Sequence, residues 1–205
     1  MSWCLRFIRP LAIVVGLLVL WQIVVWLTGV PPYILPAPTE VAAAWLARRA
    51  LILDHAALTA GEILLGLAIG SVLGCASALV MGYFRPARRW LLPVLVTSQA
   101  IPVFAIAPLL VLWLGYGMAS KVAMATLIIY FPVTAAFFDG LRRSDPGWLD
   151  LARTMGGSRW TTLRQIRIPA ALPALASGLR VATAVAPIGA VVGDWVGSSA
   201  GLGSL

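Results

Sequence analysis

Five long runs of apolar residues constrain the fold of this chain more than any other feature of its sequence. A helix needs roughly 20 mostly apolar residues to cross a lipid bilayer. The fifth run is the least uniform, because Arg180 and Asp194 interrupt it. We therefore expect an all-α polytopic membrane bundle that forms one domain over residues 1–205. The predicted spans cover residues 11–28, 63–84, 90–114, 122–138 and 170–196.

The composition agrees with a membrane protein. Apolar residues make up 61% of the chain and charged residues 11%, whereas soluble domains are about 45–50% apolar and about 25% charged. These values exclude a water-soluble globule and a disordered chain. The two cysteines, Cys4 and Cys75, lie in apolar stretches and cannot form a disulfide framework.

The basic residues predict the orientation of the spans. Cytoplasmic loops of membrane proteins carry an excess of Lys and Arg, so we expect the N-terminus in the cytoplasm. The same asymmetry accounts for the net charge of +8, and we expect no nucleic-acid partner. Five spans place Leu205 outside, and we expect that a sixth span is missing. The inner segments hold Arg6, Arg9, Arg85, Arg88, Arg89, Arg142, Arg143, Arg153, Arg159, Arg164 and Arg167, and the outer segments hold Arg48, Arg49 and Lys121.

Small residues recur every four positions in two of the predicted spans. Lipid gives helices no hydrophobic reason to associate, so small residues let their backbones approach closely. The pattern predicts either packing within the chain or an interface with a second subunit. Prolines inside the spans predict kinks, which often line a pathway in transporters. The stripes are Gly66, Gly70, Gly74, Ala78 and Gly82, then Gly178, Ala182, Ala186 and Ala190, and the prolines include Pro93, Pro102, Pro108, Pro132 and Pro187.

The basic segment 141–172 predicts two short helices on the cytoplasmic side. Asp145 can cap the first helix, which Gly156 follows. Ser158 can cap the second helix, which Pro169 is expected to close. Each helix has one apolar face and one charged face, and such a hairpin either lies on anionic lipid head groups or fills a groove on a partner.

The same segment resembles the EAA motif of bacterial binding-protein-dependent ABC importer permeases, which are MetI-like. That motif has the form E-A-A, three residues, Gly, nine residues, then I-x-L-P. Asp150, Leu151 and Ile168 are conservative departures from it, and the likeness extends over nearly the whole chain. The matching positions are Asp150, Leu151, Ala152, Gly156, Ile166, Ile168 and Pro169.

This resemblance implies a non-catalytic translocation subunit in the bacterial inner membrane. The loop would be a coupling helix seated in a separate cytoplasmic ATPase, with exposed arginines such as Arg159 pairing with acidic groups of that subunit. ATP and Mg²⁺ would bind the ATPase, because Lys121 is the chain's one lysine and lies in no P-loop. The other implied partners are a homodimer mate and an external solute-binding protein.

Seven residues are candidates for a polar or aromatic substrate pathway. Polar groups inside a bilayer are costly and need a reason. The plainer explanations are solvation at the membrane interface for Glu62 and Asp194, and a hydrogen bond between helices for Gln99. No residue is expected to be catalytic or to bind a metal. The seven are Glu62, Gln99, Pro102, Trp113, Tyr130, Asp194 and Trp195.

The branch of the family suggests a solute. Glu62 and the run 186–197 are similar to permeases for a thiamine-precursor pyrimidine of the hydroxymethylpyrimidine type, although their acidic residue at position 194 is usually Glu. The alternative is a sulfonate, taurine or nitrate-like anion, for which Arg is frequent at position 62. Outside this class we consider an intramembrane lipid-modifying enzyme and a secondary transporter driven by an ion gradient.

Overall fold

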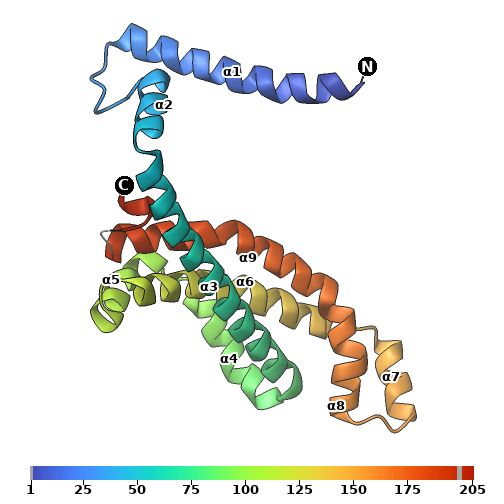
Figure 1. Cartoon of the computed structure of the whole chain (residues 1–205). Helices are drawn as coiled ribbons and strands as arrows, with labels where there is room; N and C mark the ends of the chain where they lie inside the picture. The colour runs from blue at the N-terminus through green and yellow to red at the C-terminus, as the bar shows by residue number, and fades with distance from the viewer. Residues whose placement is uncertain (1, 198–199) are drawn as a thin grey trace. The chain divides into compact units, whose positions relative to one another are not determined.

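The computed structural model describes residues 2–197 and 200–205, and these residues form helices and turns without a strand. Figure 1 shows the order of the helices along the chain. A π-helical turn at Leu163–Arg167 links α8 to α9, and a short 3-10 turn at Leu202–Ser204 ends the chain. The helices are α1 (Ser2–Thr28), α2 (Pro38–Ala47), α3 (Arg49–Tyr83), α4 (Arg85–Ser98), α5 (Val103–Leu114), α6 (Met118–Arg142), α7 (Pro146–Thr154), α8 (Arg159–Thr162) and α9 (Ile168–Gly197).

The predicted all-α membrane bundle is confirmed. In the described part of the chain, four helical segments are long and apolar enough to cross a membrane, or five if the bent pair α4–α5 makes one span. The longest single helix, α3, has 35 residues and extends well before the predicted start at residue 63.

The predicted third span, 90–114, is not one helix. It is divided between α4 and α5, whose axes differ by 104°. Pro102 has no backbone N–H and precedes α5, while Gln99, Ala100 and Ile101 bond to carbonyls only three residues back. A proline and its preceding residue disfavour a continued α-helix, so the break lies where the sequence predicted a kink.

The chain divides into two compact units, Met1–Asp54 and His55–Leu205. In the first unit, Trp21 of α1 and Trp45 of α2 line one apolar groove. The second unit contains α3 from His55 onward, α4 to α9, and the residues of the candidate sites described below.

The core of the second unit forms where α3, α6 and α9 lie side by side (Figure 1). Gly66, Gly70 and Gly74 are buried, and they face Ala125, Ile129 and the residues 133–134 of α6. A Cβ atom added at Gly66 would lie 2.5 Å from the Cβ of Ala125. The stripe on α3 therefore packs within the chain.

The second stripe packs α9 against the same helix. Gly178 faces Ala136, where an added Cβ atom would lie 2.6 Å from the Cβ of that alanine. Ala182, Ala186 and Ala190 are fully buried. Both stripes thus bring backbones together around α6, which is the central helix of the core.

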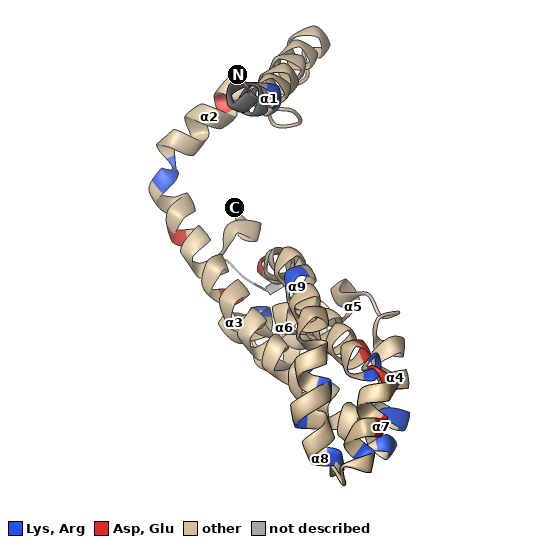
Figure 2. Cartoon of the chain, turned by 90° about the vertical axis from the view of Figure 1, so that its right-hand side faces the viewer, with Lys and Arg blue, Asp and Glu red and all other residues tan. Residues whose placement is uncertain are grey.

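The order of these contacts sets the directions of the helices. Along α6, contacts with α3 run from Gly66 to Gly82, whereas contacts with α9 run from Gly193 back to Gly178. Helices α3 and α6 are therefore parallel, and α9 is antiparallel to both. We call the end with Lys121 the ion-pair end and the end with α7 and α8 the hairpin end. Figure 2 shows Lys and Arg residues gathered around α7, α8 and the start of α4.

We predict that Gly66→Ala destabilises the second unit by about 1–3 kcal/mol, because the extra methyl group overpacks the contact with Ala125. The measurement is thermal unfolding of the purified protein in detergent. Gly61→Ala is the matched control on the same helix, since a Cβ atom at Gly61 meets nothing within 4 Å. Equal melting temperatures for the two variants would contradict close packing of α3 on α6.

Candidate functional site

The hairpin of α7 and α8 is built from local hydrogen bonds that the sequence predicts. The side chain of Asp145 accepts a hydrogen bond from the N–H of Gly147 at 2.7 Å, with Pro146 at the first helical position. The hydroxyl of Ser158 accepts one from the N–H of Thr161 at 3.1 Å. Both predicted N-caps are confirmed, and such caps stabilise a helix by about 1 kcal/mol each.

Two adjacent glycines form the turn between α7 and α8. Gly156 has φ +75°, in the left-handed region that favours glycine. Its N–H donates to the carbonyl of Arg153, and the N–H of Gly157 donates to that of Ala152. These two bonds make a Schellman motif. A Cβ atom at Gly157 would lie 2.7 Å from the carbonyl oxygen of Ala152, so both glycines are needed.

The prediction that Pro169 closes the second helix is wrong. The helical segment Arg159–Val196 continues through Pro169. The turn before the proline is π-helical, and the N–H of Ile168 donates to the carbonyl of Leu163, five residues back. A proline ring would otherwise clash with a carbonyl four residues earlier, and the wider π turn is the local departure from the α-helix that precedes it.

The two parts of the motif lie at different places in the hairpin. Leu151 on α7 and Met155 at its C-cap are 61% and 78% exposed, and Trp148 on the same face is 65% exposed. Ile168, at the base, packs against the buried core, and Ile166 is half-buried. The hairpin is therefore fixed at its base and presents an apolar face at its tip.

The charged motif residues remain at the surface. Asp150 forms an ion pair with Arg153 on α7, with 2.7 Å between the carboxylate and guanidinium atoms. Both side chains are largely exposed, and such pairs contribute little to stability. Arg159 is exposed at the start of α8.

A buried ionic cluster occupies the ion-pair end of the core. The ammonium group of Lys121 lies 2.9 Å from Oε1 of Glu62 and 2.6 Å from Oδ1 of Asp194. These residues are 3%, 1% and 0% exposed. The structure therefore brings Glu62 and Asp194 together, but as partners of one lysine rather than as solvated groups at the membrane interface.

The cluster also binds the C-terminal segment. Asp194 accepts hydrogen bonds from the hydroxyl of Thr59 and the N–H of Gly203, at 2.9 and 3.2 Å. Lys121 donates to the carbonyl of Ala200. Nδ1 of His55 accepts from the N–H of Gly201 at 2.9 Å. The last residues are thus held against α3 by polar contacts.

Lys121 was placed in an outer segment by the sequence, and this placement is wrong. It lies in the first turn of α6, fully within the packed core. One signal in the sequence pointed to its role: the chain's single lysine begins an apolar run, and two other runs carry one acidic residue each near the same side.

The remaining pathway candidates are not brought together. Gln99 and Pro102 lie at the break between α4 and α5. Trp113 and Trp195 are 71% and 75% exposed on α5 and α9. Tyr130 donates a hydrogen bond to the hydroxyl of Ser77 at 2.9 Å and so links α6 to α3.

Comparison with known proteins finds a transport family and relatives that are named as transport permeases. Residues 66–205 match the family described as binding-protein-dependent transport system inner membrane component. The chain is 56% identical, over 98% of its length and 82% of the relative, to a probable ABC transporter permease protein of Haemophilus influenzae.

Other relatives carry the names of particular solutes. A formylaminopyrimidine transport permease of Halalkalibacterium halodurans is 37% identical over 96% of this chain and 78% of its own length. A riboflavin transport permease of Chloroflexus aurantiacus is 40% identical over 92% of this chain and 71% of its own length. More distant relatives, 28% identical, include putative permeases for aliphatic sulfonates.

We predict that Lys121→Met destabilises the protein by roughly 3–5 kcal/mol, because two buried carboxylates lose their shared cation. Glu62→Gln, the matched control, should cost less, since the Lys121–Asp194 pair remains. The triple variant with Glu62→Gln and Asp194→Asn should recover part of the stability lost in Lys121→Met. Melting temperatures in detergent test this order, and a triple variant no more stable than Lys121→Met would contradict the ionic cluster.

Proposed function

Because the chain belongs to the family of inner-membrane components of binding-protein-dependent transport systems, we propose that two copies form the translocation pathway of an ATP-driven importer in the bacterial plasma membrane. The relatives are transport permeases, and this chain is likewise a transport permease subunit. In our proposal the hairpin lies in the cytoplasm, a separate ATPase binds it, and an external protein delivers the solute.

The observation that supports this proposal most strongly is the exposed apolar face of α7. Trp148, Leu151 and Met155 project from a helix whose ends are capped and whose base packs into the core. Exposed apolar side chains on a basic, rigid support favour a groove on a partner protein. We propose that the groove belongs to the ATPase.

The helix continues from α8 into α9, and this continuous helix can transmit a displacement of the hairpin to the core. The segment Arg159–Val196 is one helical path. It joins the hairpin to Asp194 at the opposite end of the core, where the C-terminal segment is bound. We propose that a displacement of the hairpin by the ATPase moves α9 along α6 and so changes access to the pathway.

The distribution of charge supports a cytoplasmic hairpin and a cytoplasmic N-terminus. The hairpin end carries α7, α8 and the start of α4, where the arginines gather (Figure 2). With Lys121 buried in the core, only Arg48 and Arg49 remain in the proposed outer segments. The asymmetry that orients membrane helices is therefore larger than the sequence suggested.

The proposed solute is a nitrogen heteroaromatic molecule, with a thiamine-precursor pyrimidine as the best candidate. Support comes from the two relatives whose names give formylaminopyrimidine and riboflavin, since both molecules are planar nitrogen heterocycles. We propose that the pathway passes the α4–α5 break, where Gln99 supplies an amide, and continues to the far end of α5, where Trp113 supplies a stacking surface. An organic sulfonate is the alternative that the experiment must include.

We predict that Met155→Glu abolishes coupling while the protein still folds, because a charge on the apolar face of α7 resists burial in a partner groove. Thr154→Glu is the matched control, since Thr154 is an exposed polar residue in the last turn of α7 and is not one of the three apolar side chains of that face. The measurement is co-purification of the co-expressed ATPase subunit of the same transporter and its solute-stimulated ATP hydrolysis. Retained coupling in Met155→Glu would contradict the proposed interface.

We predict that the solute-binding protein of this transporter is stabilised against heat by aminopyrimidines or flavins and is unaffected by taurine and alkyl sulfonates. The reconstituted complex should take up the same solute only when ATP is present. Stabilisation by sulfonates alone would replace the proposed solute with an anion, and uptake driven by an ion gradient without ATP would refute the importer itself.

A further inference from the structure

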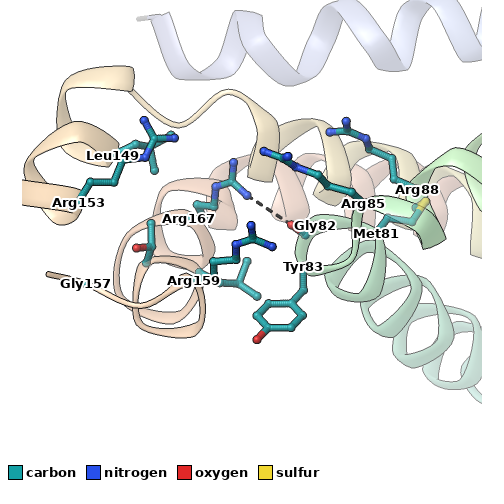
Figure 3. Close-up of a pocket in the computed structure, with 12 residues that line it drawn as sticks. Met81, Gly82, Tyr83, Arg85, Arg88, Leu149, Arg153, Gly157, Arg159 and Arg167 are labelled. Atoms are coloured by element: carbon teal, nitrogen blue, oxygen red, sulfur yellow. Dashed lines mark hydrogen bonds between the residues drawn. The ribbon is translucent and has the colours of Figure 1, made fainter.

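An arginine-lined pocket lies at the hairpin end of the core, outside the ion-pair cluster and the apolar face of α7. Its volume is about 440 Å³, within the range of pockets that hold small molecules. One wall comes from the junction of α3 and α4 and the other from the hairpin and the π turn (Figure 3). The lining includes five arginines and no acidic residue: Arg85, Arg88, Arg153, Arg159 and Arg167.

Most of this positive charge has no counter-ion in the part of the chain that the structure describes. Among the described residues, only Arg153 of the five has an ion pair, and its partner Asp150 is on the exposed side of α7. Like charges that converge on one small pocket repel one another. An anion from outside the chain would relieve that repulsion.

The guanidinium group of Arg167 has an N–H donor that forms no hydrogen bond among the described residues. It is half-buried in the π turn, and one of its terminal nitrogens donates to the carbonyl of Gly82 at a long 3.4 Å (Figure 3). Its Nε atom is buried and has no hydrogen-bond partner among the described residues. A buried guanidinium N–H without an acceptor is costly, and Arg167 is one of the residues that line the pocket.

The start of α4 adds to the positive potential. Arg85 and Arg88 are in its first turn, which contains no acidic residue, and its N-cap Phe84 offers no side-chain cap. The first amides of a helix and its dipole favour an anion at this position. Natural helices often place Asp or Glu there, whereas this helix places arginines.

We propose that this pocket binds a phosphate group, either in the head group of an anionic phospholipid or in a soluble phosphate compound. A phosphate carries several acceptor oxygens that planar guanidinium groups bind two at a time. A carboxylate offers fewer oxygens than five arginines can use. The bound phosphate would link the hairpin, through Arg159, to the α3–α4 junction, through Arg85, and so would hold the hairpin in one position.

The test uses the purified full chain and a matched pair of double variants. Arg85→Gln with Arg88→Gln removes two pocket arginines and leaves the Arg167–Gly82 bond intact. Arg89→Gln with Arg143→Gln removes two exposed arginines at the same end that do not line the pocket. Both variants lose the same charge, so their difference reports the pocket rather than the general potential of this surface.

Two arms distinguish the source of the phosphate. In detergent, the melting temperature is followed with pyrophosphate and with sodium chloride at equal ionic strength. In nanodiscs, phosphatidylcholine alone is compared with phosphatidylcholine that contains phosphatidylglycerol. Stabilisation of the wild type in either arm supports the proposal. Stabilisation by pyrophosphate identifies a soluble phosphate compound as the ligand, and stabilisation by phosphatidylglycerol identifies a lipid head group.

We expect the pocket variant to bind the effective ligand at least about tenfold more weakly, because each lost hydrogen bond between a guanidinium and a phosphate oxygen weakens binding by about tenfold or more. The control variant should bind as the wild type does. Equal loss in both variants, or no stabilisation beyond that of sodium chloride and phosphatidylcholine, would overturn the proposal. Neither result bears on importer function, which the co-purification experiment tests separately.

Discussion

Close backbone contact between α3, α6 and α9 is the interaction on which the rest of this structure depends. In a membrane, apolar side chains gain nothing by leaving lipid, so helix association relies on dispersion and close packing. Gly66 and Gly70 on α3, and Gly178 on α9, leave room for residues of α6 at distances that a larger side chain could not accept. Helix α6 is therefore packed against α3 on one side and against α9 on another.

This contact determines what lies at each end of the core. Because α3 and α6 are parallel and α9 is antiparallel, Glu62, Lys121 and Asp194 meet at one end. At the other end Met81, Leu141 and the base of the hairpin form a buried apolar cluster. Ionic groups at one end and apolar groups at the other make the register of the three helices specific, since a shift of one turn would separate the lysine from its carboxylates.

The hairpin combines local rigidity with a continuous connection to the core. Its caps and its two-glycine turn depend only on neighbouring residues. Its base continues through the π turn into α9, and the same turn carries Arg167 into the arginine-lined pocket. A partner at the exposed tip and an anion at the pocket would therefore act on the same element from opposite sides.

The sequence by itself determined the long apolar helices α1, α6 and α9, the caps of the hairpin and the small-residue faces, because each depends on contacts within a few residues or on the solvent that surrounds a run. Asp145, Ser158 and Gly156 have their predicted roles for that reason. It also predicted the break near Pro102, although as a kink rather than as two helices.

Only the tertiary structure decided what these elements meet. Lys121 resembles a loop residue until α3 and α9 bring Glu62 and Asp194 to it. Pro169 resembles a helix end until the π turn supplies the wider hydrogen bonding that lets the helix continue. The arginines of the pocket come from segments about 70 residues apart in the sequence. No local sequence pattern indicates that two such segments lie next to each other in space. Ion pairing and pocket formation depend on distances in space that the packing of the helices sets. The sequence therefore identified the charged residues but could not predict which groups they contact.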